Sequence, residues 1–97
     1  MLAHLDVVPV EESSLERWIN PPFSGKIEEG AIWGRGAMDD KSSVFSIMEA
    51  VSLLLEEDYI PERTVYLAFG HDEEVGGLHG AKIVAETFKK RGIEFIY

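Results

Sequence analysis

Apolar residues recur at helical spacing in two segments of the chain. Between residues 41 and 57 they mark one helix face, at Val44, Ile47, Met48, Val51, Leu54 and Leu55. Asp40 directly precedes this segment and is predicted to be its N-cap. The second segment runs from about Leu78 to Arg91, where three basic residues followed by Gly92 are typical of a helix C-terminus. The pattern therefore predicts two helices.

Three shorter runs have the composition of strands. Residues 1–5 are mostly apolar, residues 64–69 (TVYLAF) suit a strand buried on both faces and ending at Gly70, and residues 93–97 (IEFIY) predict a third strand. Strands that alternate with helices predict an α/β fold with a mainly parallel sheet and flanking helices. The intervening segment from Pro9 to Gly36 holds most of the prolines and is predicted to be a long functional loop.

Composition narrows the possible partners and ligands. A chain of 97 residues has room for one domain with a modest core. The formal charge of -9 argues against a nucleic acid or an anionic membrane surface as partner. With no cysteine, a metal site must use His, Asp and Glu. The sequence shows neither a membrane segment nor a signal peptide, and it leaves the compartment open.

Chemically active residues follow the predicted strands, where ligands of parallel sheets bind. In the first group, His4 and Asp6 point to the same side of an extended chain, so Asp6 can orient the imidazole of a metal-bound His4. A polar pair at a strand end is the alternative, because this short motif is common.

The second group is the run Gly34–Lys41, which leads into the first helix. Its glycines permit tight backbone turns, but the spacing is not that of a phosphate-binding loop, and Asp39 and Asp40 would repel phosphate. An aspartate here suits a bridge between two divalent cations, about 3.5 to 4 Å apart. Simple helix capping remains the alternative role of Asp40.

The third group is the run Gly70–Gly77, which contains adjacent carboxylates. One of two neighbouring carboxylates, Glu73 or Glu74, can bind metal while the other takes a proton from water. A solvated acidic turn is the alternative reading. His71 and His79 are further possible ligands, but neither has a partner like Asp6.

Together the segments HLDVVPV, NPPFSGKIEEG, IWGRGAMDDKSSV and LAFGHDEEVGGLHGA resemble the M20 family of metallopeptidases, especially its carboxypeptidase S and PM20D1-like branch. The resemblance covers nearly the whole chain. It implies that His4 binds one zinc ion, that Asp39 bridges two, and that Glu74 binds the second. It also implies that Glu73 is the general base, that Asp6 orients His4, and that the Asp39–Asp40 peptide bond is cis.

The implied reaction is the hydrolysis of an amide bond. Two zinc ions activate water, and Glu73 takes its proton and returns it to the leaving amine. Cobalt or manganese would suit the same nitrogen and oxygen ligands. The implied substrates are peptides or N-acyl amino acids, as for a carboxypeptidase or an N-acyl-amino-acid hydrolase.

The resemblance also implies that family members have metal ligands and a domain that residues 1–97 do not include. Family members add another acidic ligand, a final histidine ligand, and a lid and dimerisation domain, so a homodimer is expected only of a full-length parent. We therefore expect residues 1–97 to be a partial catalytic domain of the zinc-dependent exopeptidase type, without the lid. The alternative is a truncated, catalytically inactive product that acts as an interaction module through open sheet edges.

Overall fold

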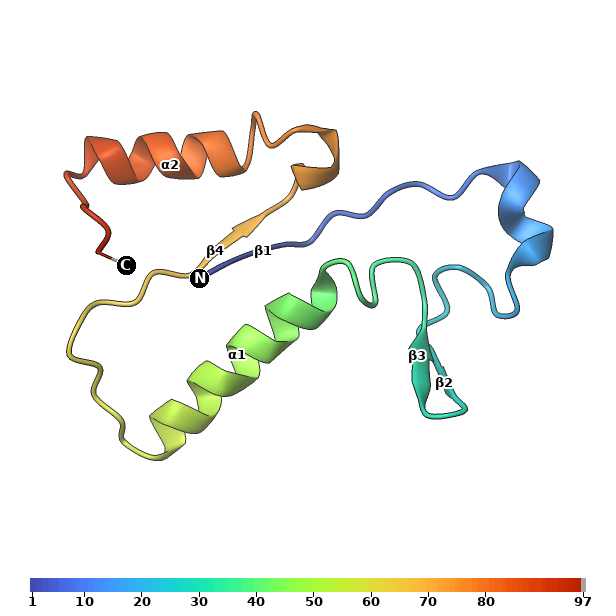
Figure 1. Ribbon diagram of the computed structural model, residues 1–97, viewed down its shortest axis with the longest axis horizontal. Helices are drawn as coiled ribbons and strands as arrows, with labels where there is room; N and C mark the ends of the chain where they lie inside the picture. The colour runs from blue at the N-terminus through green and yellow to red at the C-terminus, as the bar shows by residue number, and fades with distance from the viewer. Residues whose placement is uncertain (97) are drawn as a thin grey trace.

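The computed structural model describes residues 1–96, and two helices flank a short parallel sheet (Figure 1). The elements in chain order are β1 (Leu2–His4), the 3-10 helix η1 (Glu12–Arg17), β2 (Lys26–Glu28), β3 (Ala31–Trp33), α1 (Lys41–Glu56), β4 (Ala68–Gly70), the 3-10 helix η2 (Glu73–Val75) and α2 (Ala81–Lys90). β1 pairs in parallel with β4, with His4 opposite Gly70. α1 contacts β1, and α2 contacts β4 on the opposite side (Figure 1). The predicted α/β class is confirmed, although the parallel sheet has only two strands.

Both predicted helices form close to their expected bounds. Asp40 occupies the N-cap position of α1, but its side chain makes no capping hydrogen bond. At the other end of the second helix, Gly92 follows Arg91 with a φ of 67°. The amide of Gly92 donates to the carbonyl of Lys89, and that of Ile93 donates to the carbonyl of Phe88 at 3.0 Å. This pair of bonds is the Schellman arrangement, which ends the helix where the basic residues and glycine predicted.

The predicted long loop over residues 9–36 is wrong in part, because this segment folds into η1 and an antiparallel hairpin. β2 and β3 pair with Ile27 opposite Ile32, and Glu29 and Gly30 form the connecting turn. Both turn residues have positive φ, 51° and 76°, which is typical of the turns that suit the twist of paired strands. The hairpin is made of contacts between residues close in the sequence, and its two strands do not pair with the parallel sheet.

One strand prediction is wrong in extent, and another is wrong over the described residues. The expected strand over residues 64–69 is reduced to Ala68–Gly70, because the ladder extends only as far as β1 lies beside it. Residues 93–96 form no strand, since no described strand lies beside them, and Tyr97 lies outside the described residues. Instead, the Phe95 ring packs edge-on against Tyr66 and Phe88, with ring centroids 5.9 and 5.2 Å apart.

The hydrophobic core of the structure is smaller than the modest core that the sequence predicted. Among residues 1–96, the buried apolar side chains are Val44, at 3% exposure, and Pro22. The radius of gyration is 17.0 Å, whereas a compact domain of this length has about 12 to 13 Å. A two-stranded sheet offers little surface to cover, so one side of each helix stays open to solvent. Neither of the helices over this range combines the length and the apolar character needed to cross a membrane.

Candidate metal centre

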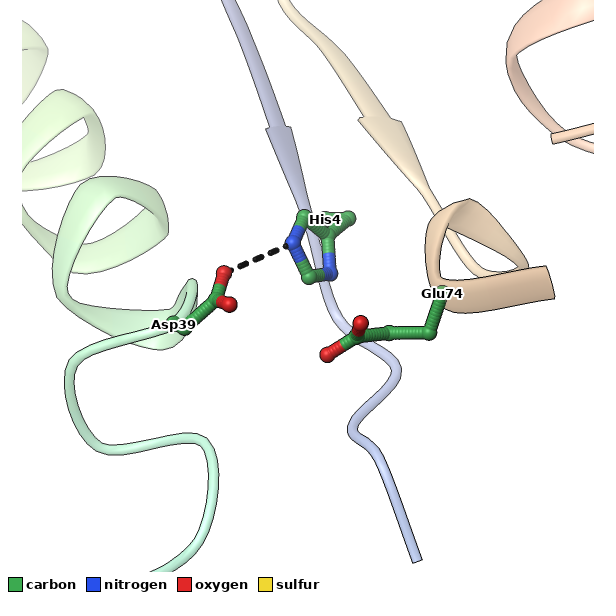
Figure 2. Close-up of side chains that lie close together, drawn as sticks. All are labelled: His4, Asp39 and Glu74. Carbon is green, nitrogen blue, oxygen red and sulfur yellow. Dashed lines mark hydrogen bonds and ion pairs between the residues drawn. The ribbon is translucent and has the colours of Figure 1, made fainter. Parts of the chain in front are cut away.

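Three side chains from separate segments meet at the carboxyl end of the parallel strands. His4 ends β1, Asp39 lies two residues before the start of α1, and Glu74 lies in η2 after β4. One ligand atom from each residue lies within 4.8 Å of the others. Figure 2 shows the imidazole of His4 between the two carboxylates, which approach it from opposite sides. The parallel pairing of β1 with β4 brings His4 and Glu74 together, because both strands end at the same edge.

The His4 ring is buried, and each of its two nitrogens lies 3.1 Å from an oxygen atom. Its Nε2 lies 3.1 Å from Oδ1 of Asp39. Its Nδ1 lies 3.1 Å from the backbone carbonyl oxygen of Asp6 and 3.4 Å from the carboxylate of the same residue. A carbonyl oxygen only accepts, so Nδ1 carries the proton in this hydrogen bond. In the neutral ring, the lone pair on Nε2 therefore faces Asp39.

The electrostatic surroundings favour positive charge at His4. Burial by itself lowers the pKa of His4, but the Asp6 carbonyl and the carboxylates of Asp39 and Glu73 raise it, and the net pKa lies above the usual histidine value. The hydrogen bond to the Asp6 carbonyl contributes most to this rise, followed by the hydrogen bond to Asp39 and the negative charges of Glu73 and Asp39. The same negative surroundings attract a cation in place of the proton on Nε2.

Asp6 connects the end of β1 to η2. Its Oδ1 accepts the backbone N–H of Glu73 at 3.2 Å, and its Oδ2 accepts that of Glu74 at 3.1 Å. Burial raises the pKa of Asp6. The two amide donors and the nearby His4 lower it by a larger amount, so the net pKa lies below the usual aspartate value. Asp6 is therefore an ionised carboxylate that contacts both His4 and the backbone of the two glutamates, and so connects them.

The segment before α1 is arranged tightly around Asp39. The Asp39–Asp40 peptide bond is cis, as the family resemblance implied. Gly36 has a φ of 80°, and a β-carbon there would lie 2.3 Å from Cγ1 of Val7, so only glycine fits. Oδ2 of Asp40 accepts the backbone N–H of His4 at 3.3 Å. Asp40 thus links α1 to β1 in place of the capping bond that the sequence predicted.

The two glutamates of η2 differ in their surroundings. Oε1 of Glu74 accepts the backbone N–H of Val8 at 3.2 Å, which holds the carboxylate beside the cluster. The Glu73 side chain is 60% exposed, and its Oε2 lies 3.8 Å from Nε2 of His4. Glu74 is therefore the more constrained group, while Glu73 lies at the rim and is open to solvent.

The structure brings together all five residues singled out in the sequence. His4, Asp39 and Glu74 form the cluster, with Asp6 and Glu73 in contact with it. His71 and His79 are exposed and are not part of it.

Two polar residues near the cluster had no assigned role in the sequence. Lys41 donates from Nζ to the carbonyl oxygen of Leu5 at 2.8 Å, which joins α1 to the chain after β1. Asp72 is 7% exposed, and its carboxylate accepts the backbone N–H of His79. The glycines that follow Asp72 at positions 76, 77 and 80 are the one sequence signal of a close-packed turn there.

The donor set fits a divalent cation of the zinc class. One imidazole nitrogen and two carboxylates are ligands that zinc accepts, and catalytic zinc sites commonly have three protein ligands. The Nδ1 side of His4 is held by Asp6, which is the usual arrangement behind a metal-binding histidine. The cluster therefore matches a metal-binding site in donor chemistry and in its supporting contacts.

Comparisons with protein families and with known proteins all point to the same family. The profile described as "Peptidase family M20/M25/M40" matches residues 1–97. The chain is 48% identical to "Probable carboxypeptidase S-like 2" of Dictyostelium discoideum, over 99% of this chain and 19% of that protein. It is 45% identical to "N-fatty-acyl-amino acid synthase/hydrolase PM20D1.1" of Danio rerio, and 43% identical to the PM20D1 protein of the same description in Homo sapiens. Each of these two matches covers 100% of this chain and 18% of the relative.

The chain spans about a fifth of the length of the curated relatives it matches. Within that fifth, the match includes every residue of the cluster at the ends of β1 and β4. The resemblance inferred from the sequence motifs is confirmed, and this chain belongs to peptidase family M20/M25/M40.

Proposed function

We propose that this chain supplies metal ligands and the general base of a hydrolase that cleaves amide bonds. The observation that carries this proposal is the convergence of His4, Asp39 and Glu74, whose ligand atoms lie within 4.8 Å of one another. These residues come from three segments that are far apart in the sequence, and the fold brings one histidine and two carboxylates together. Carboxylates at such distances repel each other, and a bound cation removes this repulsion.

The ligands divide between two zinc ions in this proposal. His4 would hold one ion through Nε2, Glu74 would hold the other, and Asp39 would contribute to both. Further ligands come from outside this segment, in line with the small share of the relatives that it spans. Cobalt(II) and manganese(II) suit the same nitrogen and oxygen donors.

The residues around the ligands have distinct tasks in hydrolysis. When bound, divalent cations act as Lewis acids and make water a better nucleophile at neutral pH. Glu73 is the general base, because its carboxylate is exposed and lies at the rim of the cluster. It accepts a proton from water, whose oxygen adds to the amide carbonyl carbon, and it donates that proton to the amine as the carbon–nitrogen bond breaks. Asp6 keeps the His4 ring in its Nδ1–H form throughout.

The substrate class is a peptide or an N-acyl amino acid. This assignment is supported by relatives described as carboxypeptidase S-like and as N-fatty-acyl-amino acid synthase/hydrolase. Both descriptions share one bond type, an amide next to an amino acid. The proposal is therefore amide hydrolysis by a partial catalytic domain.

A second candidate is an inactive product that acts through its exposed apolar surface. The observation in its favour is the small core, with Phe45 at 66% and Leu55 at 69% exposure on α1. Large exposed apolar patches favour association with another protein. This reading predicts no metal affinity and no turnover for the chain.

Zinc titration under chelator competition tests the proposal. The wild-type chain is compared with Asp39→Asn and with Glu16→Gln, a charge-matched control on η1, which lies apart from the site in Figure 1. Hydrolysis of a dipeptide and of an N-acyl amino acid is assayed alongside. Zinc binding that Asp39→Asn abolishes and Glu16→Gln retains would support the metal site, and turnover would support the hydrolase. Equal zinc affinity of wild type and Asp39→Asn would refute it.

A further inference from the structure

Asp72 is a buried carboxylate that the proposed reaction does not use. It lies between the end of β4 and the start of η2, and it is 7% exposed. Its Oδ2 accepts the backbone N–H of His79 at 2.6 Å. Its Oδ1 has no hydrogen-bond partner among the described residues. A carboxylate is costly to bury, so this one is expected to hold a specific arrangement.

The contacts of Asp72 close the loop between η2 and α2. Its backbone carbonyl accepts the N–H of Gly77 at 2.8 Å and that of Val75 at 3.3 Å. Its side chain reaches two residues further, to the amide of His79. One residue therefore holds both the first and the last part of the loop that follows the two glutamates.

Gly80 makes room for this carboxylate. A β-carbon at position 80 would lie 2.3 Å from Oδ1 of Asp72 and 3.3 Å from the backbone nitrogen of His71. Neither atom belongs to the free end of a long side chain, so the carboxylate would have to leave its position. Gly80 is also the residue that precedes α2, so the start of this helix packs directly on Asp72.

The loop held in this way directly follows η2, which carries the two glutamates of the proposed site. Glu73 and Glu74 immediately follow Asp72 in η2, and their amides donate to Asp6. A turn of three residues has few contacts of its own, so Asp6 fixes it on the side of β1 and Asp72 fixes it on the side of α2. We propose that Asp72 is a positioning residue, which holds the 76–80 loop against η2 and thereby sets the orientation of Glu73 and Glu74. This inference rests on the proposed metal site.

Zinc affinity of Asp72 variants provides the first test. Removing a residue that supports metal ligands typically weakens binding by about 10- to 100-fold, and this loss is expected for Asp72→Ala. Asp72→Asn keeps an oxygen that accepts from His79, so its affinity is expected to stay within a few-fold of wild type. Equal losses in Asp72→Asn and Asp72→Ala would overturn the role assigned to the acceptor oxygen.

Gly80→Ala tests the same contact from its other side. The added methyl group displaces the Asp72 carboxylate, so the variant is expected to lose zinc affinity as Asp72→Ala does. Gly34→Ala is the matched control, because a β-carbon there meets its nearest neighbours at an ordinary 3.6 Å. In the double variant Asp72→Ala/Gly80→Ala, the second change is expected to add little, since the group it displaces is gone. Fully additive losses would overturn the proposal.

Amide hydrogen exchange of the metal-free chain separates this inference from the proposed function. Faster exchange of the Glu73 and Glu74 amides is expected in Asp72→Ala and Gly80→Ala, with α1 amides unchanged and Asp72→Asn close to wild type. Equal acceleration in α1 would indicate general destabilisation and overturn the positioning role, as would unchanged exchange in η2. A wild-type chain that binds no zinc would refute the proposed metal site, and the exchange rates would still decide the role of Asp72.

Discussion

Oδ2 of Asp6 accepts the backbone N–H of Glu74 at 3.1 Å, although the two residues are 68 positions apart in the sequence. Oδ1 of the same carboxylate accepts the N–H of Glu73 and lies 3.4 Å from Nδ1 of His4. The sequence predicted that Asp6 orients the imidazole of His4. The two amide hydrogen bonds, which the sequence did not predict, hold both glutamates at the site.

Asp6→Asn should weaken zinc binding strongly, even though it preserves the shape of the side chain. The amide has one acceptor oxygen, so it cannot accept from both glutamate N–H groups, and its NH₂ group faces donors. We expect a loss of about 10- to 100-fold in zinc affinity, measured by chelator competition. Glu16→Gln removes the same charge from η1 and should leave the affinity unchanged. Wild-type affinity in Asp6→Asn would contradict this role of the carboxylate.

Val44→Ala should remove a large part of the total stability of the chain. Val44 is 3% exposed, and removing two methyl groups from a buried site costs about 1.5 kcal/mol. With so small a core, that loss is a large part of the total stability. The midpoint of urea unfolding measures it, and Val75→Ala is the control because Val75 is 81% exposed. Equal midpoints for the two variants would contradict a core centred on Val44.

Lys41→Met should loosen the contact between α1 and the chain after β1. The ammonium group of Lys41 donates to the carbonyl oxygen of Leu5 at 2.8 Å, and methionine keeps the length of the side chain without the donor. The free energy of unfolding is expected to fall by about 1 kcal/mol, the usual net value of one hydrogen bond. Urea unfolding measures this change. Lys82→Met, an exposed change on α2, should have a smaller effect, and the reverse order would refute the prediction.

The hairpin should lose stability in acid through Glu28. The pKa of Glu28 lies below the usual glutamate value, because its carboxylate accepts from Lys26 at 2.9 Å and from Asn20 at 3.3 Å. The folded carboxyl group therefore binds a proton less readily than the unfolded one. Its contribution is complete above the ordinary pKa of glutamate, and it is lost as the pH falls through the lower folded value.

A titration of the Glu28 carboxyl carbon by nuclear magnetic resonance checks this shift. In Lys26→Met the pKa of Glu28 should rise toward that of an ordinary glutamate, because the largest cause of the shift is removed. A Glu28 pKa that does not respond to Lys26→Met would contradict the ion pair as its cause.

The elements with strong periodic signals were predictable from the sequence. α1 and α2 have long apolar faces, and Gly92 after the basic residues marks the end of α2. The hairpin was missed because its strands have three residues each and its turn, Glu29–Gly30, lacks the asparagine or aspartate that usually signals such a turn.

The failed strand predictions have a different cause. The residues of TVYLAF and IEFIY have the composition of buried strands, but a strand needs a neighbour to pair with. In the described part of the chain, β1 pairs with residues 68–70, and no strand lies beside residues 93–96. Composition therefore indicated the tendency of these residues correctly, while the available partners determined where strands formed.

The candidate site was predictable because strand ends in a parallel sheet converge. That rule places His4 and the acidic run after β4 at one edge of the sheet. The choice of Glu74 over Glu73, and of Asp39 over Asp40, came from the family resemblance. Asp72 was not predictable in this way. Its partner is a backbone amide seven residues later, and the need for Gly80 depends on a contact that only the folded turn creates.

The pairing of β1 with β4 also determines the order in which the molecule assembles. Helices and short hairpins form within microseconds from neighbouring residues, whereas joining the first residues to position 68 requires closure of a long loop before any contact is gained. A partly folded chain can therefore contain α1 and the hairpin and still lack the site. The three donors come together only in the last, non-local step, so their convergence is a marker of complete folding.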